Sequence, residues 1–228
     1  VIIYRDFVNH YTAEKGNNKL VNLVLVLIYI DEYGFRRIEK LNNLCLDKDS
    51  KSSDKYFVAD VFDFHLKESD KHHTGKLHQF HTIIIGGDHG THFSDNYTVF
   101  NESTFYEKYG KKVECIFLCS YHAYNRCDPA GVIPKRLAAE YAKKRRPLCT
   151  SEHYAQAIND SNYDETFGYP FSKINRSEGL FPKEKEINRI ENLRKCCDVR
   201  YFYFREDGSK VHEPGIICYR LINGVGNY

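Results

Sequence analysis

Apolar residues in the first part of the chain occur in three stretches whose pattern is that of β-strands. The stretches are Val1–Phe7, Leu20–Ile30 and Phe35–Leu46, and all three contain branched apolar residues. Such residues fit a pleated, covered surface, so each stretch is predicted to be a strand. Asp31-Glu32-Tyr33-Gly34 separates the last two and is typical of a hairpin turn, because glycine accepts a positive φ. The segment predicts a three-stranded antiparallel meander, with Phe35–Leu46 polar enough to lie near a sheet edge.

The pattern then changes to an alternation of helices and strands. Phe57, Val61 and Phe64 recur at helical spacing and predict a helix with one buried face. Gly110 follows a later helical segment and is typical of the residue that ends a helix. The elements expected after the meander are a helix from Asp54 to about Glu68, a strand from His81 to Ile85, a helix within Thr98–Tyr109, a strand from Val113 to Ser120 and a basic helix from about Lys135 to Arg146.

The last third of the chain has a less regular pattern. Ser151 can cap a short helix that ends near Asn159. A charged helix is predicted over Pro182–Lys195, and Arg200–Arg205 with Val211–Leu221 forms an expected hairpin. We therefore expect an α/β core over residues 1–149 and a C-terminal α+β extension over residues 150–228.

Composition and charge narrow the range of partners. The 228 residues carry a net charge of only +2, which predicts no general affinity for polyanions. Lys135-Arg136 and Lys143–Arg146 are local basic clusters that could contact phosphates, although solvated helix faces look the same. No apolar run approaches the roughly 20 residues of a membrane-spanning helix, so no membrane partner is expected. From the absence of Met and Trp and the apolar start we expect a fragment of a longer protein, with upstream domains missing from this sequence.

Three aspartates stand where a sheet can bring carboxylates together. Asp6 lies in the first strand, Asp88 follows the apolar strand and two glycines, and Asp128 precedes the basic helix. A carboxylate at the end of a buried strand is a well-fixed ligand for Mg²⁺ or Mn²⁺, with an ordinary turn aspartate as the alternative. Three antiparallel strands followed by a β-α-β-α order is the pattern of the RNase H-like fold, in which acids from these elements meet at one sheet edge. The predicted class is α/β with an RNase H-like mixed sheet.

Three sequence blocks carry a resemblance to a known family. The blocks are Tyr4–Tyr11 (YRDFVNHY), Gly87–Phe93 (GDHGTHF) and His122–Lys135 (HAYNRCDPAGVIPK). They resemble the eukaryotic DDE-type transposase-like proteins, whose second and third motifs read roughly D-G-x-x-H-F and H-G-K-x-x-C-D-x-x-x-x-x-K. The match runs from Val1 to about Arg146. Ala123 and Tyr124, within the third block, stand where the family often has Gly and Lys.

The resemblance implies a metal-dependent enzyme of DNA cleavage and strand transfer. Asp6, Asp88 and Asp128 would be its catalytic residues and would hold two Mg²⁺ or Mn²⁺ ions. DNA is the implied partner, the nucleus the implied location, and a homo-oligomer an open option. Residues expected to orient the acids or to contact the substrate are His92, His122, Asn125, Arg126, Lys135 and Arg136.

The third acid has an alternative. Pro134 removes a helical hydrogen bond and suits the first turn of a helix, so the basic helix is predicted to begin there. Asp128 would then project from a looser turn than the family geometry requires. Glu140, farther along the same helix, is the alternative third acid.

Other functions stay open at this point. A domesticated, catalytically silent domain that binds nucleic acid or protein would keep the fold without cutting. A plain RNase H-like nuclease would cut without strand transfer. A zinc site of Cys115, Cys119, His122 and Cys127 is disfavoured, because the first two cysteines lie on one face of an apolar strand.

Overall fold

The chain folds into two compact units, shown by a computed structural model. Unit 1 comprises Val1, Val58–Ala123 and Arg176–Tyr228, and unit 2 comprises Ile2–Phe57 and Tyr124–Asn175. The structure describes residues 1–12, 19–47, 55–68, 75–88, 90, 92–118, 126–143, 148, 150–161, 163–171, 198–200, 203–204, 210–211 and 218–220.

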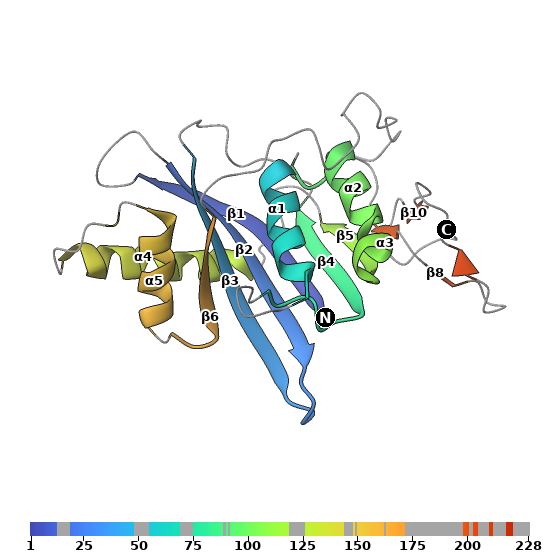
Figure 1. The fold of residues 1–228 in the computed structure, drawn as a ribbon, viewed down its shortest axis with the longest axis horizontal. Coiled ribbons are helices and arrows are strands. Elements are labelled where there is room, and N and C mark those ends of the chain that lie inside the picture. Colours follow the sequence, from blue (N-terminus) through green and yellow to red (C-terminus); the bar gives the residue numbers. More distant parts are fainter. Residues whose placement is uncertain are drawn as a thin grey trace. The chain divides into compact units, whose positions relative to one another are not determined.

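Unit 2 is built on three long antiparallel strands, β1 (Ile2–Thr12), β2 (Lys19–Ile30) and β3 (Arg36–Asp47) (Figure 1). A short strand, β6 (Thr166–Phe171), pairs with β3 in parallel. Successive β2 side chains from Leu20 to Leu27 are buried, so both faces of this strand are covered. Coverage of both faces explains why β2 is apolar almost throughout rather than alternating.

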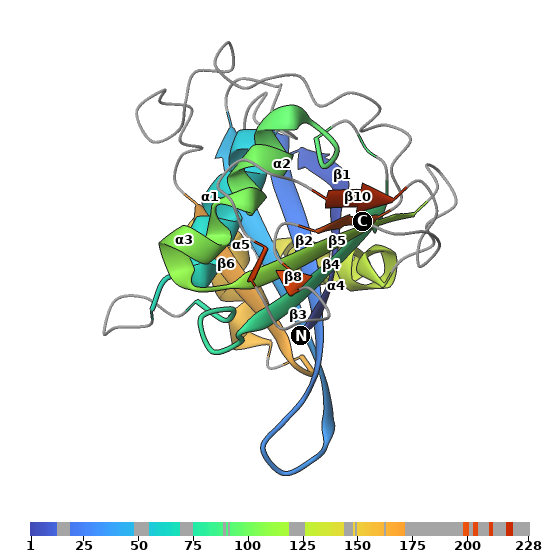
Figure 2. The same cartoon turned by 90° about the vertical axis from the view of Figure 1, so that its right-hand side faces the viewer.

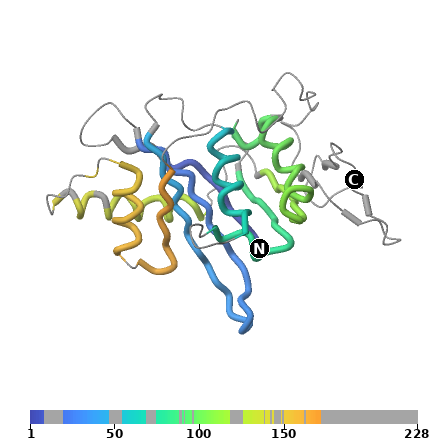
Figure 3. The backbone as a smooth tube through the Cα atoms, in the orientation of Figure 1, coloured from blue at the N-terminus to red at the C-terminus, as the bar shows by residue number. Residues whose placement is uncertain are grey.

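Two helices of unit 2, α4 (Cys127–Lys143) and α5 (Ser151–Asp160), cover one face of these strands. Figure 3 traces this backbone from β1 to β6. The core residues on this face include Leu20, Leu44, Leu137, Leu148, Tyr154, Ala155, Ala157 and Ile158. On the other face, Phe57 packs near Phe7 and edge-to-face on Phe171. Burial of this apolar surface on both faces stabilises the unit.

Unit 1 contains two parallel strands, β4 (Thr82–Asp88) and β5 (Lys112–Leu118), as Figure 2 shows. The helix α1 (Lys55–Leu66) begins in unit 2 and continues in unit 1, where Phe62 packs on Phe105 with ring centroids 5.8 Å apart. Burial of these rings forms part of the unit 1 core.

The single helix predicted within Thr98–Tyr109 is two helices, α2 (Asn96–Ser103) and α3 (Phe105–Tyr109). The side chains of Ser103 and Thr104 donate hydrogen bonds to the carbonyls of Phe100 and Asn101 at 2.6 and 2.7 Å. Such bonds compete with the helical ladder and favour a break. Gly110 ends α3 in the left-handed conformation with φ +66°, as predicted.

Short strands near the C-terminus belong to unit 1. These strands are β7 (Asp198–Arg200), β8 (Tyr203–Phe204), β9 (Lys210–Val211) and β10 (Cys218–Arg220). β7 pairs with both β5 and β10, and β8 pairs with β9, all antiparallel. The pairings agree with the hairpin predicted in this region. The charged helix predicted over Pro182–Lys195 lies outside the described residues.

Both units combine helices with strands, and parallel and antiparallel pairings occur in each, so the chain is α/β with mixed strand pairing. No helix in the described ranges is long and apolar enough to cross a membrane. The predicted boundary after residue 149 falls inside unit 2, because α5 and β6 pack with β3.

Of two predictions about individual elements, one holds and one is wrong. β3 lies near an edge of the sheet, as predicted, because β2 pairs with one side of it and the terminal strand β6 with the other. Its buried polar residues are accommodated by hydrogen bonds, such as that from the Asn43 side chain to the Leu23 carbonyl at 2.9 Å. The basic helix does not begin at Pro134 but at Cys127, seven residues earlier. Packing of Cys127 and Ala130 on the strands holds this first part of α4 despite the missing N–H of Pro134.

Candidate carboxylate site

Asp6 lies in the middle of β1, on the face of the strands that α4 covers. It is paired in register with Val24 of β2, and its side chain is half-buried. Alternation along β1 places Tyr4, Asp6 and Val8 on one face. Tyr4 and Val8 pack with the cluster formed by Val24 and α4, so Asp6 faces the same helix.

The N-terminus of α4 is fixed against β1 and β2 by two small residues. The Cys127 thiol is fully buried and donates a hydrogen bond to the Val24 carbonyl at 3.6 Å. One turn later, Gly131 lies so close to Val8 that an added Cβ would be 2.3 Å from a Val8 methyl carbon. The helix therefore starts at the level of Asp6 and crosses β1 at close range. Asp128 is exposed in the first turn of this helix.

The charges of Asp6 and Asp128 both influence the buried Cys127 thiol. Burial raises the pKa of this thiol, and the negative charges of Asp6 and Asp128 raise it further. The two carboxylates thus lie within electrostatic range of one buried sulfur atom, although they are far apart in the sequence. A thiol in this setting stays protonated at neutral pH, so Cys127 is a packing residue rather than a nucleophile.

Two other predicted site residues belong to unit 1. Asp88 is the last residue of β4, where the sequence predicts a strand-end acid, but its side chain is not among those described. His92 lies in the turn before α2, with its ring edge-to-face on Phe93 at 5.0 Å between centroids. The His92 carbonyl accepts a hydrogen bond from Thr98 at 2.7 Å. The backbone of His92 thus contributes to the entry to α2, and the role of its side chain toward an acid or the substrate stays a prediction.

The basic residues predicted to contact substrate separate onto different sides of α4. Lys135 is exposed and lies two helical turns after Asp128, on the same side of the helix. Arg136 donates to Glu140 at 3.1 Å, so its charge is locally neutralised. Glu140 is about 18 Å from Asp128 along the helix axis, from the rise of 1.5 Å per residue. This distance weighs against Glu140 as a third acid.

Arg126 is exposed immediately before α4, whereas His122 and Asn125 lie outside the described residues.

The donor set around the α4 N-terminus suits a hard cation. No group of three or more His, Cys, Asp and Glu side chains is arranged to hold a metal within the part of the chain that the structure describes. Asp6 and Asp128 supply two carboxylates, and Mg²⁺ is commonly held by one or two carboxylates together with waters and substrate phosphates. The residues present therefore fit a magnesium or manganese ion that shares its coordination with the substrate.

The described thiols of the disfavoured zinc set, Cys115 and Cys127, do not support a zinc site. The buried Cys115 thiol donates to the buried carboxylate of Glu102 at 3.0 Å in unit 1. Cys127 donates to a backbone carbonyl in unit 2. Cys119 and His122 lie outside the described residues.

The sequence reading missed three residues that line a pocket beside the start of α4. They are Arg36 and Lys40 of β3 and Tyr163 before β6. A signal existed for the first two, since Arg36, Ile38 and Lys40 alternate along one strand and share a face. Tyr163 carried no signal, because β6 was not predicted.

Comparison with known proteins identifies no relative. No protein-family model matches the chain, and neither a curated protein nor a solved structure matches it significantly.

Proposed function

We propose that this chain is the catalytic core of a DDE-type, transposase-derived enzyme that cleaves DNA phosphodiesters and transfers strands with Mg²⁺ or Mn²⁺. One observation carries the proposal: Asp6 lies on the face of β1 that α4 covers, and Asp128, from a separate sequence block, lies in the first turn of that helix. The element order from β1 to α4, with three antiparallel strands before β4 and β5, supports an RNase H-like core. On the same resemblance, the proposed location is the nucleus.

The roles of the two acids follow from how each is fixed. Asp6 is held by its register with Val24 and presents its carboxylate to the α4 face. Asp128 lies in the first turn of a 17-residue helix, where the positive end of the helix dipole offsets carboxylate repulsion. Together they would hold a divalent cation, which when bound would neutralise phosphate charge and lower the pKa of a coordinated water. Lys135, on the Asp128 side of α4, would contact a neighbouring phosphate.

Asp88 is proposed as the third acid on the sequence resemblance alone. It ends β4 after two glycines, Gly86 and Gly87, which are both buried. Glycine permits the close approach of a backbone to a ligand. His122 and Asn125 remain proposed substrate contacts on the same basis, as does the assembly of the enzyme as a homo-oligomer.

The proposal is tested by nicking of a supercoiled plasmid in Mg²⁺ and Mn²⁺. Wild-type protein should relax the plasmid, whereas Asp6→Asn, Asp88→Asn and Asp128→Asn should each abolish nicking, because each removes a charged metal ligand without changing size. Glu140→Gln is the matched control on the same helix and should nick like wild type. Wild-type nicking that survives all three Asn substitutions would show that the site is wrong. No nicking by a folded wild type would favour a silent binding domain.

A further inference from the structure

A second site lies in unit 2, in a pocket beside the start of α4. The pocket has a volume of about 530 Å³ and is lined in part by residues of β2 and β3. This volume is within the range of small-ligand sites. Its lining residues are Val26, Arg36, Ile38, Lys40, Arg126, Pro129, Ala130, Ile133, Tyr163, Asp164 and Glu165, and we name it the cation-lined pocket.

The cation-lined pocket has an apolar floor and a rim of positively charged side chains. Val26, Ile38 and Ile133 supply apolar surface, whereas three cations come from two different parts of the chain. Lys40 is already engaged, since its ammonium donates to the Asp164 carbonyl at 3.2 Å. Within the described residues, the exposed guanidinium groups of Arg36 and Arg126 make no hydrogen bond or ion pair. Two arginines are thus left to bind an anion.

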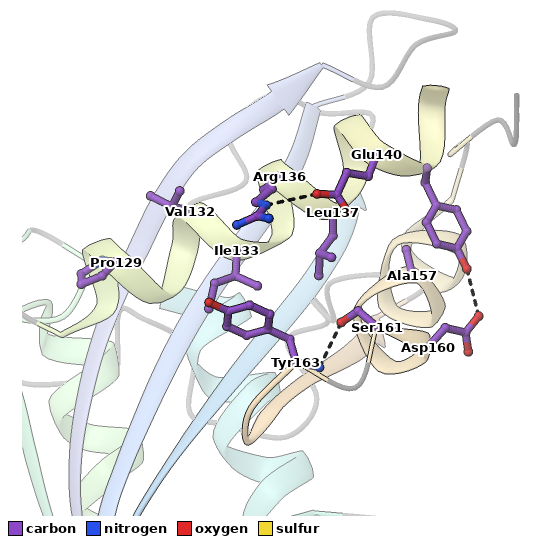
Figure 4. A pocket seen from close by; sticks show the side chains of 11 residues that line it. Pro129, Val132, Ile133, Arg136, Leu137, Glu140, Ala157, Asp160, Ser161 and Tyr163 are labelled. Carbon is purple, nitrogen blue, oxygen red and sulfur yellow. Dashed lines mark hydrogen bonds and ion pairs between the residues drawn. The ribbon is translucent and has the colours of Figure 1, made fainter. Parts of the chain in front are cut away.

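Tyr163 lines one side of the pocket, and its backbone is held by hydrogen bonds. Figure 4 draws a neighbouring pocket that Tyr163 also lines, and shows its ring beside Ile133; the residue is 45% exposed. Its backbone N–H donates to the Ser161 hydroxyl at 3.3 Å, and its carbonyl accepts from Thr166 at 3.0 Å. These bonds fix the backbone that carries the ring, and an exposed aromatic ring is a platform on which a flat apolar group can stack.

Backbone strain at Glu165, two residues after Tyr163, indicates that this side of the pocket is held in a defined conformation. Glu165 has φ +43°, a left-handed conformation that is costly for a residue with a side chain. Three hydrogen bonds to β3 hold it there: Lys40 N–H to the Glu165 carbonyl at 2.8 Å, Ile38 N–H to its carboxylate at 3.2 Å, and Arg37 to the same carboxylate at 3.4 Å. The Glu165 charge is therefore compensated by Arg37. Asp164, the other acid of the lining, is exposed at the rim.

We propose that the cation-lined pocket binds one nucleotide of a single-stranded nucleic acid, with its phosphate on Arg36 and Arg126 and its base against Tyr163. The pocket combines an apolar floor, an adjacent aromatic ring and two arginines without a partner among the described residues. This combination matches a ligand that is flat at one end and anionic at the other. Arg126 is two residues from Asp128, so the bound strand would lie next to the proposed cleavage site. The inference rests on the proposed function, since it makes the pocket the binding site for a single-stranded segment that flanks the cleaved bond in the same DNA substrate.

The test is binding of fluorescein-labelled (dT)15 to the full chain in EDTA, followed by fluorescence anisotropy over a series of salt concentrations. The Arg36→Gln/Arg126→Gln double variant should bind more weakly, and the slope of log affinity against log salt should fall by about 0.7, because the two arginines share one phosphate. Tyr163→Leu should weaken binding about fivefold or more with the slope unchanged, because base stacking carries no charge. All three substituted side chains have exposed surface, so folding should be retained, and a melting curve checks it.

Two controls make the outcome decisive. Arg136→Gln removes an arginine of the same helix that is already paired with Glu140, and it should change affinity less than twofold. Polyphosphate has no bases, so its inhibition should respond to the arginine substitutions but not to Tyr163→Leu. Equal losses for Arg136→Gln and for the pocket arginines, or wild-type binding by Tyr163→Leu, would overturn the proposal.

The same experiment separates this inference from the proposed function. If the pocket variants lose (dT)15 binding while no protein nicks DNA with Mn²⁺, the pocket stands and the catalytic proposal fails. If wild type nicks DNA and the pocket variants bind (dT)15 like wild type, the catalytic proposal stands and the pocket fails.

Discussion

At the scale of single residues, the candidate site depends on one close approach between backbone and side chain. Gly131 meets Val8 where α4 crosses β1, with no room for a Cβ. This contact and the hydrogen bond from Cys127 to Val24 fix the helix at the level of Asp6. Asp128 is exposed, and these buried neighbours on its own helix fix its position. A glycine and a cysteine thus set the geometry of two carboxylates.

Gly131→Ala should destabilise the protein by about 1–3 kcal/mol through overpacking against Val8. For a chain of this size, that loss lowers the melting temperature by roughly 2–4 °C per kcal/mol. Thermal melting measures the effect, and the double variant Gly131→Ala/Val8→Ala supplies the control. If the clash is the cause, Val8→Ala should cost less in the Gly131→Ala background than in wild type. Simple addition of the two losses would contradict the predicted contact.

At the scale of elements, the turn at the exposed end of the β2–β3 ribbon is held by the carboxylate of Asp31. Asp31 accepts hydrogen bonds from the backbone N–H groups of Tyr33 and Phe35 at 3.0 and 2.8 Å, and from Arg37 at 2.7 Å. Gly34, with φ +84°, completes the turn. The pairings of β1 and β6 stop at Ile28 and Lys40, so neither strand supports the tip. Local hydrogen bonds therefore carry the order of the ribbon end, from which Arg36 reaches the cation-lined pocket.

Asp31 makes the stability of this ribbon end depend on pH. Burial raises the pKa of Asp31, but the bonds from Arg37, Phe35 and Tyr33 outweigh it, and the net pKa lies below the usual 3.8. A carboxyl with a lowered pKa in the folded state stabilises above its unfolded value and loses that stabilisation as the pH falls through the folded value. We predict that residues 29–37 lose hydrogen-exchange protection below about pH 3.8, after correction for intrinsic exchange.

The matched variants for this ribbon are Asp31→Asn and Asp31→Ala. Asparagine keeps an acceptor for the two backbone N–H groups but loses the charge that binds Arg37, whereas alanine loses all three bonds. Protection of residues 29–37 should therefore fall in the order wild type, Asn, Ala, and the acid dependence should disappear in both variants. Equal protection in all three proteins at neutral pH would mean that Asp31 does not hold the turn.

The helix α4 shows how an element can override its local signal. Pro134 lacks the N–H that would bond to the Ala130 carbonyl, which is why the sequence predicted a helix start at this residue. Pro134 is itself buried, and Cys127, Ala130 and Gly131 pack the preceding turns on β1 and β2. Tertiary packing over two turns thus outweighs one missing hydrogen bond.

Replacement of this proline by alanine should stabilise the protein. Pro134→Ala restores the hydrogen bond and removes a helix-interior penalty of about 3 kcal/mol, partly offset by the loss of buried ring surface. A rise in melting temperature is expected, and Val132→Ala on the exposed side of α4 should change it little. A large fall for Pro134→Ala would show that the ring is a packing residue whose loss outweighs the restored bond.

At the scale of the whole molecule, the sequence predicted most elements and missed those that depend on distant contacts. The meander, α1, β4 and β5 follow from local apolar patterns. β6 was missed because its short segment, TFGYPF, contains a glycine and a proline, and it forms only by pairing with β3. The two acids Asp6 and Asp128 were found from sequence blocks, but the buried Cys127 thiol and the contact at Gly131 needed the structure. Tyr163 was missed with β6 for the same reason.

The central claim is that Asp6 and Asp128 hold a divalent cation together. The most direct measurement is calorimetric titration of Mn²⁺ into wild type, Asp6→Asn, Asp128→Asn and Glu140→Gln, each checked for folding by its melting curve. The account predicts saturable Mn²⁺ binding to wild type and Glu140→Gln, and loss of that binding in both Asn variants. Absence of binding to folded wild type, or unchanged binding by either Asn variant, would contradict it.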